Sequence, residues 1–261
     1  MTSEVFVNGT SVGTNKNGYI PFNFDITNQV KYGESNSIAV AVSHRVPNSR
    51  WYSGAGIYRD CWISMENSDI LEQYDITITA PDLASEHNGT VTTNIKFSST
   101  SLDSTDVVFT EISATVYQEW DGTLVGTSTN TNTTVKASSE FSVSLDVGVP
   151  KPTLWTTHNV SDTPRLYQVI VTLKYTKDNI PYVVTTSPEV FGYRYISYDS
   201  TGFYLNGTKT FLKGMCLHHD NGILGAETYK DATERELRIL KNCGCNCIRA
   251  THNPQSKTFL E

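Results

Sequence analysis

Short β-prone runs, separated by turn residues about every ten residues, restrict the fold of this chain more than any other feature. Valine, isoleucine, threonine and aromatic residues dominate the runs at 74–78, 107–116, 141–145, 167–175 and 181–184. No stretch between Leu71 and Phe191 repeats its apolar residues with the period of an amphipathic helix. The chain up to Phe191 is therefore predicted to be all-β.

Two β modules are expected within this region. In residues 1–67 the strand-like runs Val5–Val7 and Ile38–Val42 accompany the turn pair Asn8-Gly9. These strands are too few to close a sandwich, so we expect further strands upstream of this module. Residues 68–195 have the length and turn rhythm of an immunoglobulin-like sandwich of about 100 residues, a module that usually acts as a spacer.

The pattern changes after the second module. There the Asn206-Gly207 pair predicts a hairpin with arms at 203–205 and 211–213. The second arm is expected to run on through Leu217 into the polar run His218-His219-Asp220. The first strand of a new domain is therefore predicted to end in three polar residues.

One helix is predicted downstream, from Tyr229 to Cys243. Thr228 and Asp231 have the spacing of a capping box, and Gly244 is placed to end the helix. The apolar face of this helix is expected to consist of Ala232, Ile239, Leu240 and Cys243.

The predicted strand, the helix and the apolar run at Cys247-Ile248 follow one another in the order of a βαβ unit. One such unit cannot bury its own sheet, and a (β/α)8 barrel needs roughly 250 residues. Residues 196–261 are therefore predicted to be the truncated start of a TIM barrel whose remainder lies downstream. The expected fold class is mainly β, with only this last part mixing helix and strand.

The composition argues against two classes of partner. The formal net charge is -7, from 20 basic and 27 acidic residues without a basic cluster, so no nucleic-acid partner is expected. No window approaches the roughly 18 to 20 consecutive apolar residues of a membrane span, so no membrane partner is expected. Met1–Val5 lacks the basic and apolar segments of a signal peptide, and the compartment of the protein stays open.

The five cysteines are expected to be small buried thiols. Cys243, Cys245 and Cys247 alternate across the helix end and the following strand, without the second pair of ligands that a zinc site needs. Neither a metal site nor a cofactor site is identified from the sequence.

Polar side chains gather at the ends of the two predicted barrel strands. His218, with His219 and Asp220, follows the first strand, and Arg249 and His252-Asn253 follow the second. Neighbouring strands lie about 4.8 Å apart, so groups at the carboxyl ends of parallel strands can converge on one ligand. Imidazole and guanidinium groups suit the recognition of a polyol. His219 and Asp220 have a second interpretation, in which they make hydrogen bonds for their own loop.

Several segments resemble one enzyme family. Residues 246–254, Asn-Cys-Ile-Arg-Ala-Thr-His-Asn-Pro, are similar to the first signature of glycoside hydrolase family 2, and residues 212–226 are similar to the first barrel strand of its β-galactosidases. Residues 18–27 and 49–60 resemble the end of the family's N-terminal jelly-roll, and residues 191–194 its junction between sandwich and barrel. The resemblance spans nearly the whole chain.

The resemblance implies a domain order. Residues 1–67 would be the C-terminal part of a jelly-roll sugar-binding domain, residues 68–195 an immunoglobulin-like β-sandwich, and residues 196–261 the first βαβ portion of the catalytic TIM barrel. The implied function is that of a retaining exo-β-galactosidase, which cleaves terminal β-galactosyl residues from a β-galactoside carbohydrate.

The resemblance also implies roles for single residues. His218, Arg249, His252 and Asn253 would line the galactosyl subsite, with Arg249 near the nucleophile. Asp25 alone has the setting of a turn residue, but the resemblance implies that it reaches in from the jelly-roll to bind sugar hydroxyls. The two catalytic glutamates of the family sit on later barrel strands, so no catalytic residue is expected here and this polypeptide alone is expected to be inactive.

Further implications concern the longer protein. Family members often use Mg²⁺ or Na⁺ and the parent is expected to be a homo-oligomer, although this chain offers no complete oxygen cage for a cation. Alternatives stay open: a non-catalytic carbohydrate-binding or adhesive β-sandwich module, or another activity of the family, as a β-glucuronidase or a β-mannosidase.

Overall fold

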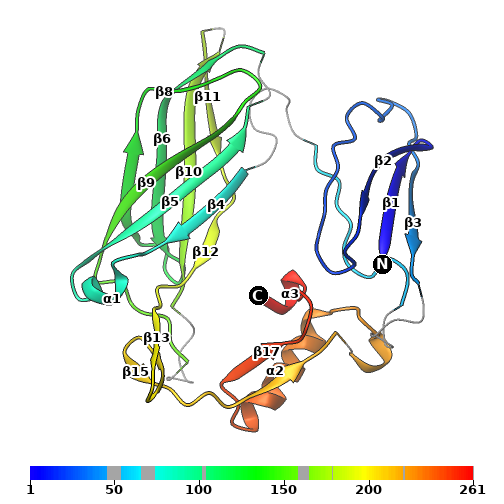
Figure 1. The fold of residues 1–261 in the computed structure, drawn as a ribbon. Coiled ribbons are helices and arrows are strands. Elements are labelled where there is room, and N and C mark those ends of the chain that lie inside the picture. The colour runs from blue at the N-terminus through cyan, green and yellow to red at the C-terminus, as the bar shows by residue number, and fades with distance from the viewer. Residues whose placement is uncertain are drawn as a thin grey trace. The chain divides into compact units, whose positions relative to one another are not determined.

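The computed structural model describes residues 1–45, 54–65, 74–101, 104–157, 165–177, 179–219 and 221–260, and these are mainly β (Figure 1). The chain forms two compact units. We call Ile63–Phe211 the sandwich unit, and Met1–Trp62 together with Leu212–Glu261 the split unit. Asp220 and part of the 49–60 segment lie outside the described residues. No helix in the described ranges is long and apolar enough to span a bilayer.

Two large antiparallel sheets form the body of the sandwich unit (Figure 1). The strand order of the first sheet is β4-β5-β9, formed by Tyr74–Thr79, Thr90–Thr100 and Glu140–Pro150. The strand order of the second is β11-β10-β6-β7, formed by Ile180–Thr185, Tyr167–Lys177, Val107–Gln118 and Leu124–Asn130. Two short strands extend the second sheet, β8 (Thr133–Val135) beside β6 and β12 (Glu189–Phe191) beside β10. The predicted strands of this region are confirmed, whereas the four-residue helix α1 (Leu83–Glu86) was not expected.

Alternating burial along these strands directs one face of each sheet into a shared core. In β5, Val91, Thr93, Ile95 and Phe97 are fully buried, while the residues that alternate with them are partly or fully exposed. The same alternation in β6, β9 and β10 adds further buried side chains, among them Phe109, Ile112, Val116, Val147, Val171 and Leu173. Burying one such side chain contributes about 1.5–3 kcal/mol, so this core is the main source of stability of the unit.

One polar pair lies inside the core. The hydroxyl oxygens of Thr93 and Tyr193 are 2.5 Å apart and share a hydrogen bond. The ring of Tyr193 packs edge-on against Tyr167 and Phe191, with centroid distances of 4.8 Å and 5.0 Å. Burial raises the pKa of Tyr193, so its hydroxyl stays protonated and tied to Thr93.

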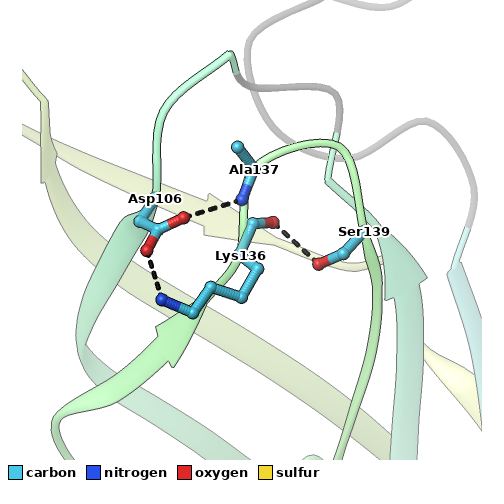
Figure 2. A network of polar contacts seen from close by, with 4 residues as sticks. All are labelled: Asp106, Lys136, Ala137 and Ser139. Carbon is cyan, nitrogen blue, oxygen red and sulfur yellow. Dashed lines mark hydrogen bonds and ion pairs between the residues drawn. The ribbon is translucent and has the colours of Figure 1, made fainter.

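A network of hydrogen bonds and one ion pair holds the loop between β8 and β9 (Figure 2). One carboxylate oxygen of Asp106 accepts the backbone N–H of Ala137 at 3.0 Å, and the other pairs with Lys136 Nζ. Ser139 Oγ donates to the carbonyl oxygen of Lys136 at 2.7 Å. The bond from Lys136 and that from Ala137 lower the pKa of Asp106. These groups are at the surface, and their contacts account for the shape of the loop.

A three-stranded sheet ends the sandwich unit, formed by β13 (Ile196–Asp199), β14 (Gly202–Leu205) and β15 (Thr208–Lys209). The turn predicted at Asn206-Gly207 is confirmed, because both residues have positive φ angles, 52° and 74°. The predicted second arm at 211–213 is wrong. That arm ends at Lys209, and the next strand starts separately because its pairing partner belongs to the split unit.

The split unit combines two parts of the sequence. Its N-terminal part is an antiparallel sheet with the order β2-β1-β3, formed by Thr10–Asn15, Thr2–Val7 and Ile38–Ser43. Its C-terminal part comprises β16 (Gly214–Leu217), the 3-10 helix η1 (Gly222–Leu224), α2 (Lys230–Asn242), β17 (Cys247–Ala250) and α3 (Lys257–Leu260). The predicted turn at Asn8-Gly9 is confirmed by φ angles of 51° and 82°.

Strands β16 and β17 pair in parallel with α2 between them in sequence, which confirms the predicted βαβ unit. The two backbones approach closely at Gly214, where an added Cβ would lie 2.4 Å from the carbonyl oxygen of Cys247. Only glycine is compatible with this approach. Gly244, with a φ of 85°, follows the helix as predicted.

Three details of this region differ from expectation. Tyr229 is the N-cap residue of α2 and no side chain caps it, so the predicted capping box is wrong. Thr233 is the buried residue of the helix, whereas Ile239 is 46% exposed, because the buried face is rotated relative to the predicted one. The five cysteines are free thiols, but Cys61, Cys216 and Cys243 are exposed rather than buried.

Candidate functional site

The register of β16 and β17 decides which side chains share a face. Cys216 lies opposite Arg249, and Leu217 lies opposite Ala250. Because side chains alternate along a strand, Cys216 and Arg249 point to one side of the pair. The backbone N–H of Thr251 donates to the carbonyl oxygen of Leu217 at 2.9 Å, which extends the pairing one residue past β17. Both strands therefore end together, at the residues that the sequence marks as functional.

His218 and His252 meet at this end. Their ring centroids are 5.4 Å apart, and the ring planes are nearly perpendicular at 83°. Both side chains are exposed, and the peptide bond before His252 is cis. Two imidazoles that are 34 positions apart in sequence thus form one polar surface, because a βαβ unit places the carboxyl ends of its strands side by side.

Arg249 lies on β17, three residues before His252 in sequence. Its Nη1 donates to Thr251 Oγ1 at 3.3 Å and approaches Cys216 Sγ at 3.8 Å. Hydrogen bonds from Thr251 and Arg249 lower the pKa of the Cys216 thiol. Within the described part of the chain, Arg249 uses only this one nitrogen in hydrogen bonds, which leaves most of an exposed guanidinium for a ligand.

His219 behaves differently from His218. It is buried, its Nε2 lies 2.9 Å from the carbonyl oxygen of Pro254, and its ring centroid is 5.1 Å from that of Tyr19. Desolvation lowers the pKa of His219, so the ring is neutral. The hydrogen bond of His219 therefore reaches the segment after β17 rather than its own loop, which neither of the two interpretations from the sequence predicts.

Asp25 takes part in a local turn. Its carboxylate accepts the backbone N–H of Thr27 at 2.8 Å and the hydroxyl of Thr27 at 2.6 Å. These bonds, the hydroxyl first, lower the pKa of Asp25. Both hydrogen bonds of this exposed carboxylate stay within the turn. Asn253, which follows His252, is half-buried. The structure brings His218 and His252 together but does not bring Asp25 into contact with them within the described ranges.

The donor set at the strand ends does not match a hard cation. Mg²⁺ and Na⁺ take oxygen ligands, whereas the groups here are two imidazoles and a guanidinium. Among the residues that the structure describes, no cluster of three His, Cys, Asp or Glu side chains could hold a metal ion. The described residues at the two strand ends therefore do not fit the cation that the resemblance implies.

Sequence reasoning missed Arg59. Its guanidinium donates to two carbonyl oxygens, that of Tyr19 at 2.6 Å and that of Pro254 at 2.8 Å. The second bond joins residues that are 195 positions apart, and no periodicity or local motif can reveal such a partner. The only sequence signal was that Arg59 lies in a segment that resembles the family.

A β-sandwich followed by the first βαβ unit of a parallel barrel, with functional groups at the strand ends, defines a multidomain protein of the barrel class. Three family models match consecutive parts of the chain. The model described as the sugar binding domain of glycosyl hydrolases family 2 matches residues 1–67, that described as glycosyl hydrolases family 2 matches residues 73–194, and that of the family's TIM barrel domain matches residues 197–261. The chain belongs to glycoside hydrolase family 2.

Relatives carry two different activity names. Beta-galactosidase BoGH2A of Bacteroides ovatus is 34% identical over 263 residues, which cover 100% of this chain and 29% of the relative. A beta-glucuronidase of Bacteroides fragilis is 29% identical over 267 residues, which cover 97% of this chain and 36% of the relative. The chain thus spans about a third of the length of these relatives.

Solved structures agree with the fold. A family 2 member from Bacteroides cellulosilyticus has a TM-score of 0.80 at 30% identity, with 100% of this chain and 34% of that chain covered. A beta-glucuronidase from Bacteroides uniformis has a TM-score of 0.77 at 28% identity, with 99% and 31% covered. The predicted fold class, from partial jelly-roll through immunoglobulin-like sandwich to barrel start, is confirmed by these matches.

Proposed function

We propose that this chain is the sugar-binding part of a retaining exo-β-galactosidase that removes terminal β-galactosyl residues. The observation that carries the proposal is the meeting of the His218 and His252 rings, with centroids 5.4 Å apart, at the ends of two adjacent parallel strands, one of which carries Arg249. His218, His252 and Asn253 bind hydroxyl groups of the galactosyl unit. Arg249 orients the carboxylate nucleophile that a later barrel strand supplies.

The chemistry of these groups supports the proposal. A neutral imidazole offers one donor and one acceptor, which is what a sugar hydroxyl needs from its partners. Because the ring planes of His218 and His252 are nearly perpendicular, their ring nitrogens face different directions and can serve hydroxyls that point differently from one pyranose ring. An arginine beside them carries a permanent charge and several fixed donors, which suits a carboxylate.

The proposal also includes Asp25 as a sugar-binding residue. Its carboxylate already accepts two hydrogen bonds from Thr27, yet it is exposed and has acceptor sites to spare for sugar hydroxyls. Asp25 therefore binds the sugar as a preformed turn residue.

Substrate choice is the finer part of the proposal. Relatives named as galactosidase and glucuronidase match this chain at similar identity, and the preference for a galactoside rests on the form of residues 212–226. The test is a panel of nitrophenyl β-galactoside, β-glucuronide and β-mannoside with the longer protein that contains this chain. We expect the highest kcat/KM for the galactoside. A higher value for either other substrate would replace the proposed activity by that one.

The chain alone is proposed to be inactive. Retaining hydrolysis needs two carboxyl groups about 5–5.5 Å apart across the scissile bond. Glu227 lies in the loop that precedes α2 and not at the end of a strand. We expect no turnover of the galactoside by the polypeptide of 261 residues. Turnover by the purified chain would refute this part. A longer protein that binds galactose but hydrolyses no glycoside would favour the carbohydrate-binding alternative.

A further inference from the structure

We propose that Arg59 and His219 form a clamp on the carbonyl oxygen of Pro254, and that this clamp positions His252 and Asn253 for sugar binding. The inference rests on the proposed function, because it concerns the same site. Arg59 and His219 are positioning residues in this proposal and do not touch the sugar.

Arg59 is held in a fixed orientation. Its two terminal nitrogens donate to the carbonyl oxygens of Tyr19 and Pro254, and its guanidinium carbon lies 5.2 Å from the ring centroid of Tyr58. Tyr58 is fixed in turn, because its hydroxyl donates to the carbonyl oxygen of Gly18 at 2.8 Å. A planar guanidinium with donors in a rigid fork can bridge two carbonyls in this way, whereas the ammonium of lysine is a single point on a flexible stem.

His219 supplies the second half of the clamp. Its Nε2 lies 2.9 Å from the same Pro254 oxygen. Because a carbonyl oxygen only accepts, Nε2 must carry the proton, which fixes the tautomer of this neutral ring. The ring packs against Tyr19, whose own carbonyl is bound by Arg59. One carbonyl oxygen of the loop thus receives two donors from two distant parts of the chain.

The clamp encloses the two residues that the site needs. At one end of the loop, the N–H of Thr251 is bound to the carbonyl of Leu217, and at the other end Pro254 is clamped. Only His252 and Asn253 lie between these anchors. On the opposite strand, His218 lies between Leu217 and His219, which are the partners of the same two anchors. The backbone on both sides of each site histidine is therefore fixed by contacts between the two strand ends.

A purely stabilising role is the rival interpretation, and it makes a different prediction. If the bonds to Pro254 only added stability, their loss would lower the melting temperature and leave the sugar kinetics of the folded protein unchanged. If they position the loop, their loss weakens sugar binding even where the protein is fully folded. Misplacement of a binding group by about 1 Å can cost as much as 100-fold in rate.

The experiment compares four variants: His219→Ala, His219→Gln, Arg59→Lys and Leu240→Ala. The amide nitrogen of glutamine can take the place of histidine Nε2, so His219→Gln keeps the donor to Pro254. Leu240→Ala removes packing from α2, where Leu240 is half-buried, without touching the clamp. It is the control for lost stability in the same unit.

The first measurement is kcat and KM for nitrophenyl β-galactoside in the longer protein, at a temperature where every variant is folded. We expect His219→Ala and Arg59→Lys to lower kcat/KM by roughly 10- to 100-fold, chiefly through KM. The kcat/KM of His219→Gln should be within about threefold of that of the parent, and the kcat/KM of Leu240→Ala should equal that of the parent. Unchanged kinetics in His219→Ala and Arg59→Lys would overturn the proposal.

The second measurement separates the clamp from the proposed function. Proton NMR of the 261-residue chain detects the proximity of the His218 and His252 rings through their nuclear Overhauser effect. We expect the effect in the parent and in His219→Gln, and its loss in His219→Ala. Its persistence in His219→Ala would overturn the clamp. Absence of glycosidase activity in the longer parent protein would instead refute the proposed function and leave the NMR result to decide on the clamp.

Discussion

The sandwich unit and the split unit are built from similar strands but are held together differently. The buried hydrophobic cluster lies entirely between Leu83 and Tyr193, within the sandwich unit. In the described part of the split unit, Val7 is the single buried hydrophobic residue, and the other buried side chains are polar: His219, Thr233, Thr251 and Ser256. The site-bearing unit therefore relies on strand pairing and hydrogen bonds to carbonyls where the sandwich unit relies on apolar packing.

The difference teaches where each unit is sensitive. A unit with a filled apolar core loses stability when a side chain is removed from that core. A unit held by directional contacts loses its site when a single backbone approach or donor is disturbed. Function lies in the second unit, where polar groups must stay accessible to a ligand.

The largest expected effect is that of Phe97→Ala in the sandwich unit. Phe97 is fully buried and packs against Phe141 and Tyr74, with ring centroids 6.0 Å and 5.9 Å away. Its truncation should lower the free energy of unfolding by about 3–5 kcal/mol, measured by urea denaturation. The nuclear Overhauser effect between His218 and His252 should persist in the folded protein. Loss of this effect would show that a change in the sandwich core also disturbs the site in the split unit.

Gly214→Ala, in the split unit, should disturb the site itself, whereas Phe97→Ala should leave the site intact. The new Cβ would meet the carbonyl oxygen of Cys247 at 2.4 Å, so the β16–β17 pair must separate. We expect a cost of about 1–3 kcal/mol and loss of the contact between the two site histidines. The matched control is Gly54→Ala, because an added Cβ at Gly54 meets nothing within 4 Å. An intact histidine contact in Gly214→Ala would contradict the account of strand pairing.

The smallest expected effect concerns the polar pair of the sandwich core. Tyr193→Phe leaves the buried Thr93 hydroxyl without its partner, at a cost of about 1–2 kcal/mol. Adding Thr93→Val should recover part of that loss, because no buried hydroxyl then remains unpaired. A double variant that is less stable than Tyr193→Phe, as measured by urea denaturation, would argue against this explanation.

The pair of Tyr193 and Thr93 also makes the stability of the sandwich unit depend on pH. Burial raises the pKa of Tyr193 above its ordinary 10.0, so the unfolded chain releases this proton at a lower pH than the folded one. The stability from this group is therefore complete below pH 10 and falls as the pH rises above it. The fall should be absent in Tyr193→Phe, and an equal fall in both proteins would assign it to other groups.

Much of the fold follows from local pattern. Runs of β-prone residues identify β6, β9 and β10, and one face of each of these strands is buried. The convergence of His218 and His252 could also be predicted, since a βαβ unit has one handedness and one functional edge. Both features depend on short-range sequence rules.

The remaining features depend on tertiary context. The buried face of α2 is set by its packing neighbours. The hairpin ends at Lys209 because β16 pairs with β17 in the split unit instead of continuing the hairpin. The contact from Arg59 to Pro254 joins residues far apart in sequence, and no local rule encodes it. Likewise, the turn around Asp25 could be predicted from Thr27, but whether that carboxylate reaches a sugar could not.

The most direct test of the central claim is a double-mutant cycle of His218→Ala and His252→Ala in the longer protein, read as kcat/KM for nitrophenyl β-galactoside. If both imidazoles bind the same sugar, the two losses should be non-additive, with a coupling energy of about 0.5–3 kcal/mol. Effects that add within about 0.3 kcal/mol, or single variants as active as the parent, would show that the two histidines do not form one sugar-binding site.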